Sequence, residues 1–184
     1  SVTVFTDGVV PTYAGNDTTI CEGDTLQLGG NPTSVIGSTF SWTPANLVDD
    51  ATVANPMAFP NVDTWFYLET TNDTCSGIDS VFITVNPYPF ANAGNDIQIC
   101  IGDTTQLSAS GGVDFLWNTS TDLSDESIFN PLAWPADTTD FVVNVTDAFG
   151  CSQTDTMMVI VNPLPNANAG INDTICFGDT TQLL

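Results

Sequence analysis

The sequence contains no lysine, no arginine and no histidine in its 184 residues. Without histidine there is no imidazole to act as a base or metal ligand, and without lysine no amine can form a Schiff base. We therefore expect no catalytic residues. A chain without cations cannot neutralise phosphate, so we expect no nucleic-acid partner. No apolar run reaches transmembrane length, and we expect no membrane insertion in this segment.

The charge that is present has one sign. The 22 acidic side chains give a net charge of −22, a value typical of disordered chains. However, 42% of the residues are hydrophobic and 10% are aromatic, which is enough apolar material to build cores. We therefore predict a folded protein whose acidic surface favours solubility and hard cations such as Ca²⁺.

The dominant pattern is an internal repeat of about 75–79 residues. The Ala-Gly-Asn-Asp of Ala14–Asp17 returns at Ala93–Asp96, and the Cys-x-Gly-Asp-Thr that follows at Cys21 returns at Cys100 and Cys176. Phe-x-Trp, Asn-Pro and Cys-Ser recur at matching places. We predict the last strand of a preceding repeat at 1–10, two repeats at 11–86 and 87–162, and the start of a truncated repeat at 163–184, as in a window from a longer array.

Each repeat is predicted to be all-β. Short Thr-, Val-, Ile- and aromatic-rich segments alternate with Gly, Pro, Asn and Asp clusters, and no segment keeps a helical period. Strands are predicted at 18–20, 25–28, 39–43, 57–59, 65–70 and 80–85, and at 97–99, 105–109, 114–117, 132–134, 140–146 and 156–161. About seven short strands in 75 residues fit a small immunoglobulin-type sandwich, with Trp42 and Trp117 in the cores.

These motifs resemble the PKD-like and immunoglobulin-like repeats of giant Bacteroidota surface proteins exported by the type IX secretion system. The resemblance rests on AGND-x₃-C-x-GDT, Phe-x-Trp, Asn-Pro and the Cys-Ser before the last strand, and it covers essentially the whole chain. It implies an extracellular location and a role as a stalk, spacer, adhesive module or fibre. The first repeat departs from the second by a four-residue insertion between Leu28 and Phe40.

Cysteines occur twice in each complete repeat. An oxidising compartment favours disulfides, and the simplest pairing lies within repeats, joining Cys21 to Cys75 and Cys100 to Cys151. In a sandwich, however, Cys21 and Cys75 should lie at opposite ends. A link between repeats, Cys21 to Cys151, therefore stays open as an alternative, because sequence alone does not fix connectivity.

The carboxylates suggest calcium. The densest acidic loops could supply the oxygen ligands that Ca²⁺ requires, and the alternative is that these side chains only cap turns on a solvated face. The candidate ligands are Asp49, Asp50, Asp122, Asp125 and Glu126.

Two further groups are candidate surface sites. Asp-Thr and Asp-Ser pairs look like the O-glycosylation motif of Bacteroidota exported proteins, and the alternative is that these pairs simply open strands. These residues are Thr18, Thr25, Ser80, Thr104, Thr138, Thr156, Thr174 and Thr180. Aromatic residues at non-equivalent positions, Trp65, Tyr67 and Trp134, could contact a sugar or a neighbouring subunit, or pack at a module junction.

The sequence thus predicts a structural segment of a large secreted surface protein that forms a stalk or fibre. Its partners would be neighbouring repeats and, in a homo-oligomeric fibre, further copies, with calcium screening the repulsion. The alternatives are a carbohydrate-binding or adhesive module and an accessory segment of a secreted enzyme.

Overall fold

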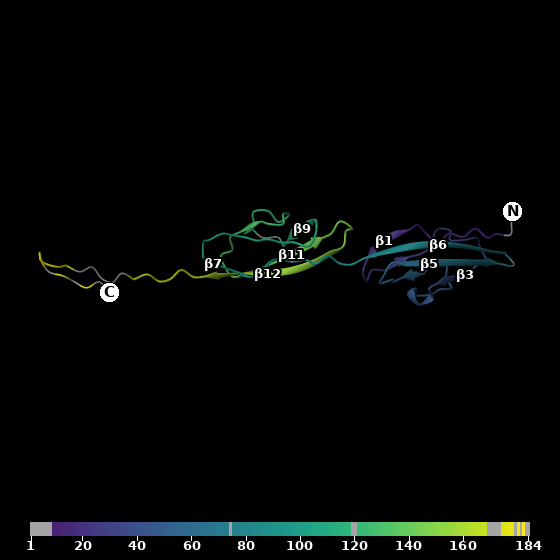
Figure 1. Ribbon diagram of the computed structural model, residues 1–184, viewed down its shortest axis with the longest axis horizontal. Helices are drawn as coiled ribbons and strands as arrows, with labels where there is room; N and C mark the ends of the chain where they lie inside the picture. Colours follow the sequence, from purple (N-terminus) through teal and green to yellow (C-terminus); the bar gives the residue numbers. More distant parts are fainter. Residues whose placement is uncertain are drawn as a thin grey trace. The chain divides into compact units, whose positions relative to one another are not determined.

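The computed structural model describes residues 9–73, 75–118, 121–168, 174–178, 180 and 182 (Figure 1). The chain forms two compact units. The first comprises Ser1–Phe90 together with two short pieces of the second repeat, Gly111–Val113 and Thr146–Gln153. The second comprises Ala91–Ser110, Asp114–Val145 and Thr154–Leu184.

The first repeat is a two-sheet sandwich. A four-stranded sheet has the order β1 (Thr18–Cys21), β6 (Cys75–Asn86), β5 (Thr64–Asn72) and β3 (Thr39–Thr43). A second sheet pairs β2 (Leu26–Gln27) with β4 (Met57–Ala58). The sole helical turn described here, η1 (Ala45–Leu47), follows β3. Strand β1 runs parallel to β6, whereas the other pairs are antiparallel.

The second repeat has the same strand order. Its larger sheet runs β7 (Ile97–Cys100), β12 (Ser152–Asn162), β11 (Thr139–Thr146) and β9 (Asp114–Trp117). Its smaller sheet pairs β10 (Leu132–Ala133) with β8 (Thr105–Gln106). Strand β7 is again parallel to the last strand of its repeat. This order, a parallel first strand beside the last strand and a separate two-stranded layer, defines an immunoglobulin-like β-sandwich.

Each sandwich has its own hydrophobic core. Trp42, Phe66 and Ile83 are at most 1% exposed in the first, and Trp117, Phe141 and Val159 occupy matching places in the second. The period-two alternation of apolar residues along the long strands sends these side chains to one face of the sheet. The predicted core tryptophans and the all-β immunoglobulin-like class are confirmed.

Six strands form each described repeat, one at each of the six ranges predicted for it. The last two strands of each repeat are longer than predicted, since their polar ends continue as a hairpin. The predicted repeat boundaries stay predictions: residues 1–8 and most of 169–184 lie outside the described residues, and Val9 pairs with Ser76.

Aspartates attach the parallel edge strand in both repeats. The Ala14 N–H donates to Asp79 Oδ2 at 2.9 Å, and the Phe82 N–H donates to Asp17 Oδ1 at 2.8 Å. The second repeat makes the same bonds with Asp155 and Asp96, at 2.8 and 2.9 Å. Charged acceptors make stronger hydrogen bonds than neutral ones. Strand attachment therefore explains why Asp17 recurs at Asp96 and Asp79 at Asp155.

Candidate functional site

A disulfide joins the two sequence repeats. Cys21 and Cys151 are bonded, with their Cα atoms 5.7 Å apart and a sequence separation of 130. The bond lies inside the first compact unit, because that unit includes the Thr146–Gln153 hairpin tip. The predicted pairing within repeats, Cys21 to Cys75 and Cys100 to Cys151, is wrong, and the alternative link is the one that forms.

The strand register explains why the pairing within repeats fails. Cys21 is opposite Asn86 at the last residue of β6, whereas Cys75 is the first residue of the same strand. At about 3.3 Å per residue, these two ends of β6 lie roughly 35 Å apart. A disulfide needs Cα atoms within about 7 Å. The same argument separates Cys100, which is opposite Asn162, from Cys151, which directly precedes β12.

A tight turn presents Cys21. The Asp24 N–H donates to the Cys21 carbonyl at 3.0 Å, and Asp24 Oδ2 accepts a longer bond from the Cys21 N–H at 3.4 Å. Gly23 lies between them with φ of 84°, a conformation that favours glycine. The Cys-x-Gly-Asp motif is thus a turn that places a thiol at the end of the edge strand.

A hairpin tip presents Cys151. Asp147 Oδ1 accepts bonds from the Phe149 N–H at 2.8 Å and the Cys151 N–H at 3.0 Å, and the Asp147 N–H donates to the Cys151 carbonyl at 2.9 Å. Gly150 adopts φ of 88° in this loop. Cys151 is 1% exposed, so its half of the disulfide is buried.

The remaining cysteines are free thiols. Cys75 is half-buried, and Cys100 and Cys176 are exposed. Cys75 is the first residue of β6. The hairpin tip before Cys75 is one residue shorter than the tip before Cys151, because Asn72 pairs with Cys75 whereas Asp147 bonds to Cys151. Cys100 ends β7 in a turn of the same design as that of Cys21.

The acidic loops are occupied by local hydrogen bonds. Asp50 Oδ1 accepts from the Thr52 N–H at 2.9 Å and its hydroxyl at 2.6 Å, and Asp125 accepts from Ser127 at 2.8 and 2.7 Å. These bonds lower the pKa of Asp50 and of Asp125, with the side-chain hydroxyl as the larger cause in each case. Asp49 Oδ1 similarly accepts from the Met57 N–H at 2.8 Å.

The capped turns support the cores. Each brings a carbonyl onto a buried tryptophan: the Trp42 indole N–H donates to the Val53 carbonyl, and that of Trp117 donates to the Ile128 carbonyl, both at 3.0 Å. Glu126 takes part through its backbone, because its carbonyl accepts the Trp117 N–H at 2.8 Å. The turn-capping interpretation thus has direct support.

Calcium binding in these loops stays a prediction. Asp122 uses its backbone carbonyl to accept the Trp134 N–H at 2.9 Å. Over the residues that the structure describes, no group of three or more Asp, Glu, His or Cys side chains could hold a metal ion. The same residues include no helix long and apolar enough to span a bilayer.

The predicted aromatic contacts separate into two places. Trp65 and Tyr67 lie on the same face of β5, are 48% and 49% exposed, and stack with ring centroids 6.4 Å apart. Phe82 on β6 adds a third ring, 4.9 Å from Trp65. Trp134 is 40% exposed and belongs to the second unit. The structure thus assembles an aromatic cluster of Trp65, Tyr67 and Phe82 in the first repeat.

The predicted glycosylation sites are mostly accessible, and their modification stays a prediction. Ser80 is half-buried within β6, and the hydroxyl of Thr138 already accepts the Val161 N–H at 3.1 Å. The exposed candidates are Thr18, Thr25, Thr104, Thr138, Thr156, Thr174 and Thr180.

The strand order and the disulfide define the chain as a tandem of immunoglobulin-like β-sandwiches. It matches no protein-family model and no curated protein sequence. Solved structures to which this chain is similar include the I67–I69 fragment of the titin I-band, at 12% identity and a TM-score of 0.44, over 84% of this chain and 65% of that fragment. The chain thus spans about two thirds of that fragment's length.

Two further structures are similar to this chain. Domains 3–5 of Drosophila OTK are 12% identical over 80% of this chain and 59% of that one, with a TM-score of 0.43. The insect immune protein hemolin is 14% identical over 83% of this chain and 46% of that one, with a TM-score of 0.41. The fold assignment itself rests on the strand order and register described above.

Proposed function

We propose that this chain is a structural repeat segment of a large secreted cell-surface protein, where it forms part of a stalk or extracellular fibre. The observation that carries the proposal is the Cys21–Cys151 disulfide, which joins one sandwich repeat to the next in sequence. A link of this kind constrains how repeats move relative to each other and has no evident use in binding a small ligand. The proposal assigns no catalytic role to the chain.

The disulfide changes how the chain carries tension. A force applied before Cys21 and after Cys151 passes through the sulfur–sulfur bond and leaves the intervening segment unloaded. That segment holds the first long hairpin and most of both cores, whereas β12 with Met157 and Val159 lies beyond Cys151. At about 3.6 Å per extended residue, roughly 450 Å of contour length cannot extend while the disulfide is intact. Such an arrangement suits a tether that must not lengthen under load.

Composition supports an extracellular setting. Disulfides persist in oxidising compartments, and a net charge of −22 keeps a repetitive protein soluble. We further propose that the parent protein is of the Bacteroidota surface type that the motifs resemble, exported by the type IX secretion system. Calcium-bridged homo-oligomeric fibres belong to the same proposal.

Single-molecule stretching of the full chain, held at its two ends, tests the tether role. In oxidising buffer we expect the residues between Cys21 and Cys151 to contribute no extension at any force below rupture. Addition of a reductant should release roughly 450 Å of further contour length. The double variant Cys75→Ser/Cys100→Ser is the matched control and should behave like the unaltered chain. Release of the full contour length without reductant would contradict the proposal.

A second candidate function is adhesion to a glycan. The aromatic cluster of Trp65, Tyr67 and Phe82 favours it, because stacked and half-exposed rings are suited to the apolar faces of sugars. A glycan array should then show binding that Trp65→Ala abolishes and that Trp134→Ala, an exposed tryptophan in the other unit, leaves intact. Absence of binding to every glycan would remove this candidate.

A further inference from the structure

Two free cysteines occupy the positions of the two bonded ones. Cys100 lies in the same turn as Cys21: the Asp103 N–H donates to the Cys100 carbonyl at 3.0 Å, and the Cys100 N–H donates to Asp103 Oδ2 at 3.2 Å. The Ile101 N–H donates to the Asn162 carbonyl at 2.9 Å. In the first repeat the Glu22 N–H donates to the Asn86 carbonyl in the same way. Cys100 therefore has the local geometry of a cysteine that forms a disulfide with another repeat.

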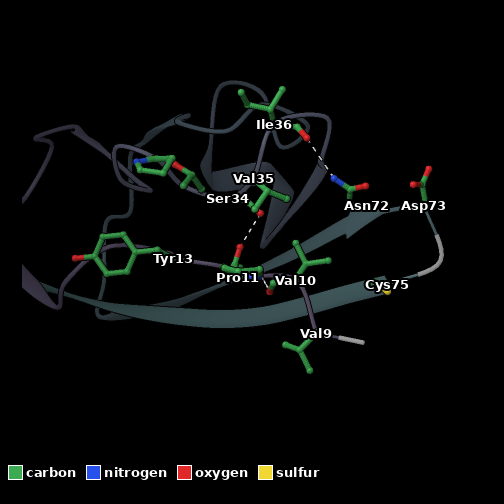
Figure 2. A pocket seen from close by; sticks show the side chains of 13 residues that line it. Val9, Val10, Pro11, Tyr13, Ser34, Val35, Ile36, Asn72, Asp73 and Cys75 are labelled. Atoms are coloured by element: carbon green, nitrogen blue, oxygen red, sulfur yellow. Dashed lines mark hydrogen bonds between the residues drawn. The ribbon is translucent and has the colours of Figure 1, made fainter. Parts of the chain in front are cut away.

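Cys75 has the matching role on the other side. It begins the last strand of its repeat, as Cys151 directly precedes the last strand of the second repeat. It also lines an open groove of about 960 Å³, whose other walls are Val9–Tyr13, Pro32–Ile36 and Asn72–Asp73 (Figure 2). The groove is mainly apolar, with Val9 and Ile36 strongly exposed.

The groove corresponds to a part of the second repeat that carries a bonded cysteine, Cys151. Ser34 forms an isolated antiparallel β-bridge with Thr12, and Ser110 forms one with Asn92 in the second repeat. The loop after Ser110 and the hairpin tip at Cys151 belong to the same compact unit as Cys21. In the first repeat the corresponding loop and tip are the groove walls, and they stand open beside a free thiol (Figure 2).

We propose that this groove receives the Cys100–Asp103 turn of a second copy of this chain, and that Cys75 and Cys100 then form a disulfide. The proposal rests on the proposed structural function and extends it: the link seen once inside the chain would be repeated from copy to copy. Ile101 is 49% exposed and follows Cys100 where Glu22 follows Cys21, so this turn offers an apolar side chain to an apolar groove.

The chemistry is thiol–disulfide exchange with a small disulfide oxidant, here oxidised glutathione. The Cys100 thiolate attacks one glutathione sulfur and releases one reduced glutathione. The Cys75 thiolate then attacks the Cys100 sulfur of the mixed disulfide and releases the second. Two thiols and one oxidised glutathione thus give one protein disulfide and two reduced glutathiones.

The test mixes two full-length variants that each keep one of the two thiols and the Cys21–Cys151 bond. Cys75→Ser/Cys176→Ser retains Cys100, and Cys100→Ser/Cys176→Ser retains Cys75. They are incubated in a glutathione redox buffer with about 0.5 M NaCl, because two copies with 22 negative charges each repel strongly without screening. Crosslinked dimers are measured on non-reducing gels and mapped by mass spectrometry.

We expect the mixture to form dimers at least about tenfold faster than either variant alone, with a Cys75–Cys100 crosslinked peptide. Ile36→Asp in the variant that retains Cys75 should slow the reaction, whereas Ile78→Asp, an exposed change elsewhere in that repeat, should not. Equal rates in all three samples, or no dimer in the mixture, would overturn the proposal. A count of free thiols in the same samples reports separately whether Cys21–Cys151 has formed, on which the proposed function depends.

Discussion

Asp155 accepts the backbone N–H of Ala93 through its Oδ2 atom at 2.8 Å, and Ala93 is completely buried. The bond spans 62 positions and ties the chain that enters the second sandwich to the last strand of that sandwich. An equivalent bond joins Ala14 to Asp79 in the first repeat. In a chain without cations, these aspartates find their partners among backbone amides.

Loss of this bond should destabilise the second sandwich. Asp155→Ala leaves the Ala93 amide buried without an acceptor, which costs about 1–3 kcal/mol of unfolding free energy. Asp155→Asn keeps an acceptor oxygen at the same place and should lose less. Urea denaturation measures the free energy, and hydrogen exchange of the Ala93 amide should accelerate in Asp155→Ala. Equal effects of the two substitutions would show that the hydrogen bond is not the cause.

The buried tryptophan of the second repeat gives a second prediction. Trp117→Phe removes the indole N–H that the Ile128 carbonyl accepts and leaves a void, so we expect a loss of about 1–3 kcal/mol. Trp65→Phe is the matched control, because Trp65 is half-exposed and no more than about 0.5 kcal/mol should be lost. Urea denaturation followed by fluorescence distinguishes the two. A similar loss for both variants would contradict the assigned packing.

Acid should weaken the capped turns. The pKa values of Asp50 and Asp125 are lowered in the folded state by hydrogen bonds from Thr52 and Ser127. A lowered folded pKa contributes stability above the unfolded value of 3.8, and that stability is lost as the pH falls through the folded pKa. The variant Asp50→Asn/Asp125→Asn keeps the acceptor oxygens without the charge.

In about 0.5 M NaCl, which screens the general repulsion, the unaltered chain should be more stable than this variant at pH 6. The difference in unfolding free energy should shrink below about pH 4 and vanish well below the folded pKa values. Urea denaturation from pH 6 to pH 2 provides the measurement. A difference that stays constant across this range would mean that the charge does not strengthen the two turns.

Salt should stabilise the protein. Among its side chains every charge–charge interaction is repulsive, and raising NaCl from about 0.01 M to 1 M shortens the screening length from about 30 Å to 3 Å. We expect Tm to rise by roughly 5 °C, the equivalent of one to two kcal/mol for a chain of this size. Millimolar CaCl₂, compared with NaCl at equal ionic strength, checks the calcium prediction. A Tm that does not rise with NaCl would refute the repulsion argument.

The fold was largely predictable from the sequence, whereas the site was predictable only in part. Alternation in the segment that became β6 and the recurrence of Trp42 at Trp117 are local signals, and they specify strands and cores directly. Disulfide partners depend on which end of a strand each cysteine occupies. The sequence already suggested that Cys21 and Cys75 lie at opposite ends of a sandwich, but only the register of β1 against β6 decides between the two pairings. A search for alternating segments does not detect that parallel edge.

The aspartates show the same limit. The densest acidic loops of the sequence suggested calcium sites or turn caps, because carboxylates are the usual ligands of calcium. Asp79 and Asp155 instead accept amides that lie more than 60 positions away. A contact of that range leaves no periodic trace near either residue, so only the assembled sheet reveals it.

The Cys21–Cys151 disulfide also affects how the protein responds to proteolysis. Each of the 130 peptide bonds between these cysteines is bypassed by the sulfur–sulfur bond, so a single cut at any of them leaves the two fragments in one covalent molecule. The four-residue insertion that helps form the groove walls lies within this span. A protease that nicks this exposed loop would open the backbone without releasing either end of the chain.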